Sequence, residues 1–285
     1  MHWFRSNVRG KIYSLTGGKY HIKDLQGNMH FLPAAGIFRH KNITPIVGDI
    51  VEFEPQKFIS EIYERKNSFI RPKVANIDTI IVVMSVVEPD FQSYLVDKYL
   101  AFVESHDIEP LLFITKIDLA LSNWKDVYKS MGYPVYEIDY KNGNLKQDLR
   151  CIFEGKVISL MGQSGVGKTT FINAVAGTNF ETQEISKFAN RGKHTTRVVQ
   201  IIETLGGELI DTPGFSSLDI NLEPIKLANS FKQFKELSKM CKFKSCLHVD
   251  EPESWCNVKL HLKDGTIPEF RYKNYLKMMK EAKNE

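Results

Sequence analysis

The sequence lacks the features of membrane-spanning, secreted and fibrous proteins. No apolar run in its 285 residues reaches the ~18 residues that a membrane-spanning helix needs, and the strongest candidate, at 80–87, is followed by Glu88, Pro89 and Asp90. The first ten residues lack the apolar stretch of a secretory signal. Four cysteines in a chain of this length do not make a disulfide framework. We therefore expect a cytoplasmic protein, in a reducing compartment and without a membrane partner.

Length and charge indicate several domains. A chain of 285 residues, 42% hydrophobic and 25% charged, is globular and long enough for two or three domains. Residues 1–75 contain 12 Lys and Arg against 6 Asp and Glu, residues 76–221 contain 13 against 19, and residues 222–285 contain 13 against 9. An acidic middle flanked by two basic parts suggests that the flanks approach a polyanion, although solvated lysine-rich faces would give the same pattern.

The first seventy residues are predicted to be all-β. Short runs rich in β-branched and aromatic residues occur at 8–15, 18–25, 28–35 and 48–54, and glycine-containing turns separate them. This spacing indicates a small barrel or sandwich, and an OB-like barrel also fits the basic charge because such barrels bind nucleic acid.

The middle of the chain is predicted to be an α/β domain. Near-continuous apolar runs at 77–86 and 110–116 are typical of strands buried on both faces, and the segment 91–107 between them has helical spacing. Further strands are expected at 134–138, 156–161, 197–202 and 207–210. Strands that alternate with helices predict a parallel sheet covered by helices. From residue 222 onward the chain is lysine-rich and helix-prone.

Residues 162–169 match the phosphate-binding pattern G-x-x-x-x-G-K-[ST] between a predicted strand and a predicted helix. Its backbone N–H groups would cradle phosphate oxygens, Lys168 would reach the β- and γ-phosphates, and the Thr169 hydroxyl would bind Mg²⁺. The predicted nucleotide-binding residues here are Gly162, Gln163, Ser164, Gly165, Val166, Gly167, Lys168, Thr169 and Thr170.

Two further segments complete a guanine nucleotide site. Asp211, at the end of a predicted strand, suits a Mg²⁺ ligand acting through water, and the N–H of Gly214 would contact the γ-phosphate. Thr115, Lys116, Ile117 and Asp118 follow another buried strand, where the carboxylate of Asp118 would accept hydrogen bonds from guanine. The base-reading segment precedes the phosphate loop, whereas the usual order of GTPases is the reverse. The sequence is therefore circularly permuted.

These motifs resemble the bacterial circularly permuted GTPases of the RsgA/YjeQ (YloQ) family. The resemblance covers essentially the whole chain and includes the segments 71–78, 115–118, 162–170, 191–196 and 211–217. It implies an OB-fold-like RNA-binding domain over 1–70, a circularly permuted P-loop GTPase domain over 71–221 and a mainly α zinc-binding domain over 222–285. It also implies a monomeric hydrolase that acts on GTP during late maturation of the 30S ribosomal subunit, is stimulated by that subunit, and binds 16S rRNA through its flanking domains.

Two positions depart from the family pattern. Thr115 stands where the family has asparagine, and a hydroxyl makes fewer hydrogen bonds than an amide. Asp139 and Tyr140 stand before Lys141, where the family has Ser-Ala. An ATPase is the competing enzyme, since both departures touch base recognition.

The residue after Gly214 is Phe215, which cannot orient water as the glutamine of Ras-like enzymes does. The resemblance makes His194 the catalytic candidate, although His194 could instead shape the switch segment or contact RNA. Thr195 or Thr196 would reach Mg²⁺. An RNA-binding module that senses GTP with negligible hydrolysis is the competing non-enzyme function, and Phe215 favours it.

Three cysteines and a histidine cluster near the C-terminus. Cys241, Cys246, His248 and Cys256 form a donor set typical of one structural zinc ion. In the family the last cysteine follows the histidine by five residues, whereas here the spacing is longer, and His261 is the alternative fourth ligand. Reduced free cysteines in a helical domain are the alternative to a metal site. Cys151, far away in sequence, is expected to be a buried thiol.

Overall fold

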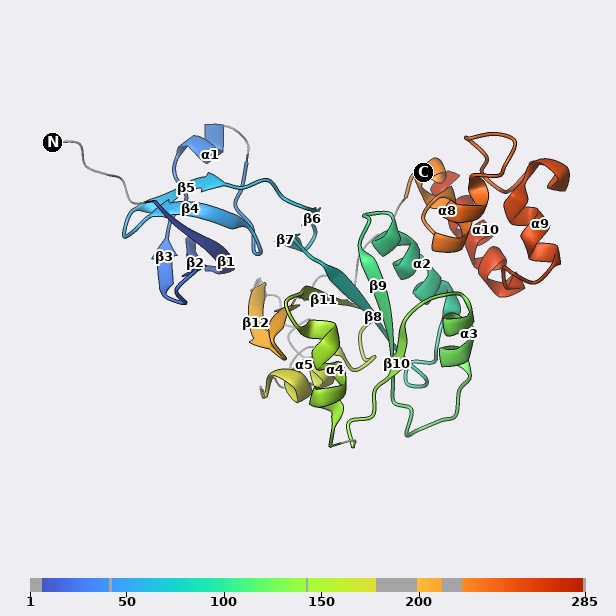
Figure 1. The fold of residues 1–285 in the computed structure, drawn as a ribbon, viewed down its shortest axis with the longest axis horizontal. Coiled ribbons are helices and arrows are strands. Elements are labelled where there is room, and N and C mark those ends of the chain that lie inside the picture. The colour runs from blue at the N-terminus through green and yellow to red at the C-terminus, as the bar shows by residue number, and fades with distance from the viewer. Residues whose placement is uncertain (1–6, 41–42, 142, 178–198, 212–221, 284–285) are drawn as a thin grey trace, which may run out of the picture. The chain divides into compact units, whose positions relative to one another are not determined.

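The computed structural model describes residues 7–40, 43–141, 143–177, 199–211 and 222–283, and the chain divides into two compact units (Figure 1). Each unit combines separate stretches of sequence. The first unit comprises Met1–Asp78, Gly143–Leu160 and Thr169–Phe215, and the second comprises Thr79–Asn142, Met161–Lys168 and Ser216–Glu285. No helix among the described residues is long and apolar enough to cross a membrane.

The N-terminal strands of the first unit form a closed ring of pairings. The strands are β1 (Val8–Thr16), β2 (Lys19–Asp24), β3 (Met29–Leu32), β4 (Ile50–Glu54) and β5 (Phe58–Ile62), with a short helix, α1 (Ile37–His40), after β3. β1 pairs antiparallel with β2 and β4, β2 with β3, and β4 with β5. A parallel bridge between Ala34 and Ile59 joins the end of β3 to β5 and closes the ring.

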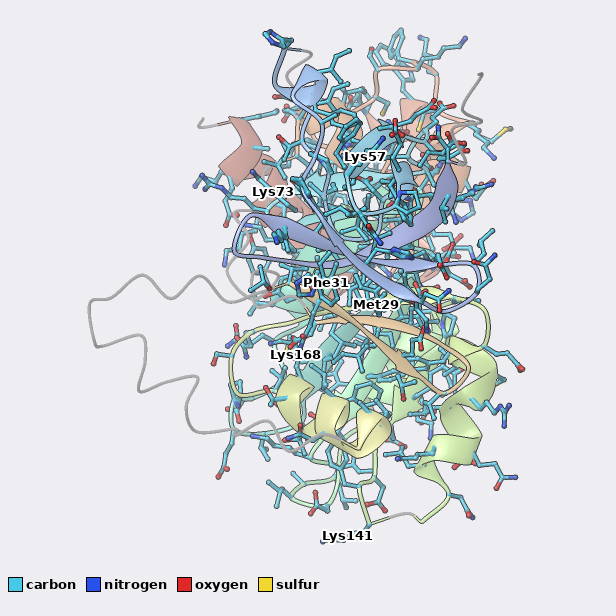
Figure 2. The ribbon with its side chains drawn as sticks, turned by 90° about the vertical axis from the view of Figure 1, so that its left-hand side faces the viewer. Met29, Phe31, Lys57, Lys73, Lys141 and Lys168 are labelled. Atoms are coloured by element: carbon cyan, nitrogen blue, oxygen red, sulfur yellow. The ribbon has the colours of Figure 1, made fainter. Side chains whose placement is uncertain are left out.

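Alternation of side chains gives this barrel an apolar interior. The inward-facing residues include Ile12, Ile22, Val51, Phe53 and Ile59, all of them fully buried. On the outward face of β3, Met29 and Phe31 are about half exposed (Figure 2). A one-residue register slip would expose the whole inward set, so the hydrophobic pattern fixes the pairing of the strands.

A hairpin of β6 (Ser68–Ile70) and β7 (Lys73–Ala75) packs against the loop before β4. Gly48 has a φ of 92°, and a Cβ at this position would lie 2.1 Å from the carbonyl oxygen of Ala75. Glycine is therefore required here both by backbone conformation and by space.

The rest of the first unit carries the strand that ends at Asp211. Its elements are α4 (Leu145–Phe153), β11 (Val157–Met161), α5 (Lys168–Ala176), β12 (Gln200–Thr204) and β13 (Gly207–Asp211). β11 and β13 are parallel, as predicted for the α/β core. β12, in contrast, is antiparallel to β13, so the expectation of a purely parallel sheet is wrong for the strand at 197–202. Only Leu205 and Gly206 separate the two strands, and such a short connection permits a hairpin but no crossover.

Cys151 is exposed, which corrects the expectation of a buried thiol. The buried face of α4 consists of Leu145, Leu149, Ile152 and Phe153. Position 151 lies off that stripe, so its side chain faces solvent.

The second unit contains three parallel strands. The elements are β8 (Thr79–Ser85), α2 (Ser93–Glu104), β9 (Glu109–Thr115), α3 (Trp124–Ser130) and β10 (Val135–Glu137). β9 pairs with β8 on one side and β10 on the other, with Ser85 opposite Thr115. The carboxyl ends of all three strands therefore meet at one edge, where ligands of such sheets bind.

Five short or medium helices complete the second unit. They are α7 (Pro224–Ala228), α8 (Lys232–Ser238), the 3₁₀ helix η2 (Glu253–Trp255), α9 (Asn257–Lys263) and α10 (Glu269–Lys283). Phe231, Phe234, Tyr275 and Met279 are buried in their core, and Ala101 of α2 joins the same cluster. The C-terminal helices thus share a core with α2.

A buried ion pair joins α10 to α2 within that core. Asp97 and Arg271 are both fully buried, with Nε of Arg271 3.7 Å from Oδ1 of Asp97. Asn274 donates to the other carboxylate oxygen at 2.7 Å, and Arg271 donates to the hydroxyl of Tyr133 at 2.5 Å. Burial raises the pKa of Asp97, and the charge of Arg271 opposes that shift.

Removing one partner of this pair should destabilise the protein more than removing both. We expect Arg271→Met to lower the free energy of unfolding by about 3–5 kcal/mol, because Asp97 would become a buried carboxylate without its cation. The double variant Asp97→Asn/Arg271→Met should recover part of that loss. Equilibrium urea unfolding followed by fluorescence and circular dichroism measures both, and a double variant no more stable than Arg271→Met would contradict the argument.

Candidate nucleotide site and metal centre

The predicted phosphate loop lies between β11 and α5. A Cβ on Gly162 would lie 2.3 Å from the carbonyl oxygen of Val83 in β8, so the loop can approach that strand only with glycine at its start. Gly167, at the other end, has a φ of 97°. Glycine at these two positions permits the tight backbone turn that a phosphate-binding loop requires.

Lys168, the first residue of α5, turns back onto the loop. Its Nζ donates to the carbonyl oxygens of Gly162 and Gln163, both at 2.6 Å. Burial lowers the pKa of Lys168 to about 8. An ammonium group held by two carbonyls and partly removed from water favours an anionic ligand, which would restore its full charge.

Thr115 connects the base-reading segment to the phosphate loop. It is the last residue of β9 and is fully buried. Its hydroxyl donates to the carbonyl oxygen of Val166 at 2.6 Å. The threonine that departs from the family pattern therefore holds the loop backbone two residues before Lys168.

Tyr140, the second departure, contacts the neighbouring carbonyl. Its hydroxyl lies 3.3 Å from the carbonyl oxygen of Gly167, and burial raises its pKa. Asp139 accepts a hydrogen bond from the backbone N–H of Lys141 at 2.8 Å, which fixes the turn that carries Tyr140. Tyr140 belongs to the site by position. The sequence showed only that Tyr140 departs from the family pattern. It could not show that the hydroxyl reaches the carbonyl oxygen of Gly167, because that contact joins residues far apart in sequence.

Asp118 and Lys116 also have partners within the second unit. Lys141 Nζ lies 3.1 Å from Oδ2 of Asp118, and this hydrogen bond lowers the pKa of the Asp118 carboxyl. Lys116 has a φ of 57° and donates to the carbonyl oxygen of Glu88. Asp118 is exposed and ionised, as an acceptor for two guanine N–H groups must be. Ile117 lies half-buried between them.

The second unit thus brings together most predicted nucleotide residues, from Thr115 to Asp118 and from Gly162 to Lys168. Thr169 and Thr170, in the first turn of α5, belong to the first unit, as does Asp211, the last residue of β13. His194, Thr195, Thr196 and Gly214 lie outside the described residues, so their predicted roles stay predictions.

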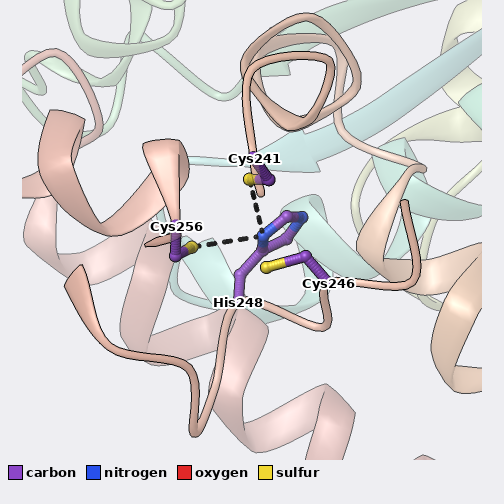
Figure 3. A group of neighbouring side chains, drawn as sticks. All are labelled: Cys241, Cys246, His248 and Cys256. Carbon is purple, nitrogen blue, oxygen red and sulfur yellow. Dashed lines mark hydrogen bonds between the residues drawn. The ribbon is translucent and has the colours of Figure 1, made fainter. Parts of the chain in front are cut away.

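The four predicted metal ligands lie together in the C-terminal helical part (Figure 3). The ligand atoms of Cys241, Cys246, His248 and Cys256 are all within 4.8 Å of one another. His248 Nδ1 lies 3.8 Å from Cys241 Sγ and 3.4 Å from Cys256 Sγ. His261 is hydrogen-bonded to Asp264 at 2.8 Å and is outside this group.

The protonation chemistry of this group fits a metal ion. Burial raises the pKa of the Cys246 and Cys256 thiols and lowers the pKa of His248. The imidazole is therefore neutral and able to bind a cation. A bound cation would replace the thiol protons and offset the cost of burying thiolates. A group of three thiols and one imidazole can therefore hold a metal ion.

Two family models match the chain. The model of the RsgA N-terminal domain matches residues 9–58, and that of the RsgA GTPase matches residues 62–221. The chain belongs to the RsgA GTPase family. A relative from Mycoplasmopsis agalactiae, the small ribosomal subunit biogenesis GTPase RsgA, is 62% identical over 98% of this chain and 99% of its own length. The protein of the same name from Staphylococcus haemolyticus is 41% identical over 96% and 97%.

Two solved structures of similar proteins have the same fold. The crystal structure of YloQ, described as a circularly permuted GTPase, matches with a TM-score of 0.82 and 35% identity, over 100% of this chain and 98% of that one. YjeQ from Thermotoga maritima matches with a TM-score of 0.82 and 32% identity, over 98% and 99%. These matches confirm the predicted family and its permuted order.

The hydroxyl of Thr115 should contribute to nucleotide affinity through the loop rather than through the base. We expect Thr115→Val to weaken GDP binding about two- to tenfold, because it removes one hydrogen bond and leaves the Val166 carbonyl without that donor. Thr115→Ser keeps the hydroxyl and should bind normally. Titration with a fluorescent GDP analogue tests this, and equal affinities for the two variants would exclude the role.

Proposed function

We propose that this protein is a GTP-hydrolysing assembly factor for late maturation of the small ribosomal subunit. The observation that carries the proposal is the contact of the base-reading segment with the phosphate loop, Thr115 to Val166, in a permuted chain. The printed name of the relatives, small ribosomal subunit biogenesis GTPase, supports the cellular role.

The second unit would bind the nucleotide. Loop N–H groups of residues 162–168 bind the phosphates, and Lys168 exchanges its two carbonyl contacts for phosphate oxygens. Asp118 leaves Lys141 and accepts from the N1–H and exocyclic amine of guanine, a pair of donors that adenine lacks. Since the Thr115 hydroxyl is already used by Val166, base discrimination depends on Asp118.

The magnesium ligands would be Thr169, Asp211 through water, and Thr195 or Thr196. When bound, Mg²⁺ neutralises the charge that develops on the phosphates. Gly214 would supply an N–H to the γ-phosphate. His194 would orient the attacking water by accepting a hydrogen bond from it at a ring nitrogen. Phe215, at the usual glutamine position, cannot do so because its side chain has no polar atom.

Zinc would be the ion held by Cys241, Cys246, His248 and Cys256. Three thiolates and an imidazole suit a tetrahedral structural site without an open position. Bound zinc supplies cross-linking of the C-terminal loops rather than chemistry at the nucleotide. The four ligands come from loops around α8, η2 and α9.

The flanking parts would hold rRNA. We infer an OB-type domain over 1–70, supported by the barrel order β1-β2-β3-β5-β4 and its basic composition. The GTPase domain spans 71–221 and the zinc-binding domain 222–285. Contacts with phosphates would make binding to 16S rRNA weaken steeply with salt.

Stimulation by the small subunit tests the whole function. Single-turnover GTP hydrolysis should be slow alone and rise strongly with purified 30S particles. His194→Ala should lose most of the stimulated rate, about 10²-fold, while GTP affinity is retained. His194→Gln, whose amide can also orient water, should lose less.

Each competing function predicts a different result. Equal rates with and without 30S particles would contradict a stimulated factor. Displacement of labelled GTP by excess ATP would support an ATPase. Phosphate release no higher than background would support a nucleotide sensor.

The metal should be required for the C-terminal helices. We expect one zinc per chain in the purified protein and its loss in Cys246→Ser, with a fall in the unfolding temperature on the order of 10 °C because the buried donors lose their cation. The control is Cys151→Ser, an exposed thiol outside the group. Metal analysis and thermal circular dichroism measure both effects, and zinc retained by Cys246→Ser would exclude this ligand set.

A further inference from the structure

Two large aromatic side chains stay exposed on the loops that carry the metal ligands. Phe243 lies between Cys241 and Cys246, and Trp255 directly precedes Cys256. Phe243 is 45% exposed and Trp255 is 40% exposed. Their ring centroids are 5.7 Å apart in an edge-to-face arrangement. Exposed aromatic rings that pack on each other form a rigid apolar surface that folding alone does not require.

The same contacts that assemble the metal group fix these rings. The backbone N–H of Lys242 donates to the carbonyl oxygen of Trp255 at 2.9 Å. The backbone N–H of Asn257 donates to Cys241 Sγ at 3.3 Å. The loop with Phe243 and the loop with Trp255 are therefore joined beside the ligands, so the surface is preformed when the metal group is intact.

Lysines flank Phe243 in sequence, and one of them lies over the Trp255 ring. Lys242 Nζ lies 3.8 Å from the centroid of Trp255 and 5.6 Å from that of Phe243. Within the described part of the chain, neither Lys242 nor Lys244 forms an ion pair, and residues 237–249 contain no Asp or Glu.

The acidic residues nearest in sequence are already paired, Glu236 with Lys239 at 2.5 Å and Asp250 with Lys283 at 3.8 Å. Glu253 pairs with Lys263 at 2.5 Å. Glu251 accepts hydrogen bonds from the N–H groups of Leu247 and Val249 at 2.7 and 3.0 Å. These carboxylates therefore do not neutralise Lys242 or Lys244, and Lys242 brings its charge to the face of Trp255.

We propose that Lys242, Phe243, Lys244 and Trp255, the metal-loop surface, bind single-stranded RNA. Aromatic faces stack on unpaired bases, and adjacent lysines neutralise the phosphates that connect them. An acidic protein segment would use the lysines but would gain little from two exposed rings, so RNA is the occupant that uses all four side chains. This inference rests on the proposed function, which makes ribosomal RNA the available partner.

The test compares Trp255→Ala and Phe243→Ala with wild type in binding to 30S particles and to protein-free 16S rRNA. Each variant should weaken both affinities about tenfold, since stacking of one base on an aromatic ring is of that size. Ile225→Ala, which removes an apolar side chain of equal exposure on α7, is the matched control and should bind as wild type does. Lys244→Ala should reduce the slope of log affinity against log salt by about 0.7.

Metal content and basal GTP hydrolysis are measured for each variant, so that a folding defect is recognised by loss of zinc and only metal-loaded variants are compared. Weakened binding to 30S particles with unchanged binding to 16S rRNA would overturn RNA as the occupant and indicate a ribosomal protein. If the variants bind both as tightly as wild type does, the metal-loop surface does not bind RNA, and the proposed function is unaffected. A wild-type protein that binds neither would overturn the proposed function together with this inference.

Discussion

The buried pair of Asp97 and Arg271 is the constraint on which the arrangement of the second unit depends. A buried carboxylate and guanidinium need hydrogen-bonding partners besides each other, and Asn274 supplies one to Asp97 while Tyr133 supplies one to Arg271. Because these residues come from α2, α10 and the segment before β10, the pair joins the helical part to the three parallel strands. A packing that separated the two charges would leave each of them buried without its counter-ion. The pair therefore favours the observed position of the metal-bearing helices.

That specificity extends to the nucleotide site through β9. Its buried residues pack under α2, and its last residue, Thr115, donates to Val166. One strand thus connects the core that holds the C-terminal helices to the backbone of the phosphate loop. Tyr140, after β10, adds a second hydroxyl at Gly167. The permuted order along the chain does not disturb this geometry, because parallel strands bring their carboxyl ends to one edge whatever their succession in sequence.

Local patterns predicted the parts of the site whose chemistry fixes a spacing. A phosphate loop needs its glycines and lysine at set intervals, and a metal group needs its thiols and imidazole close in sequence, so Lys168 and Cys246 could be found without a structure. Long-range contacts carry no such pattern. Asp97 is one acidic residue in an amphipathic helix, and only the fold shows that it is fully buried opposite Arg271. The antiparallel orientation of β12, in contrast, had a local signal that was missed, because only Leu205 and Gly206 separate it from β13 and so short a connection permits only a hairpin.

The barrel and the strand that ends at Asp211 are parts of one structure in the first unit. Ser14 of β1 pairs with Gln200 of β12, so the barrel adds to the β12–β13 hairpin. Across the join, the hydroxyl of Tyr13 lies 2.7 Å from Glu203 and 2.9 Å from Glu208. These carboxylates are direct neighbours on the hairpin, and Lys23 and Lys11 neutralise one each, at 2.5 and 2.7 Å. Two like charges side by side favour separation unless cations offset them, so the barrel lysines stabilise the hairpin itself. The basic N-terminal part therefore has two uses for its charge, and only the lysines that have no partner on the hairpin are available to a polyanion.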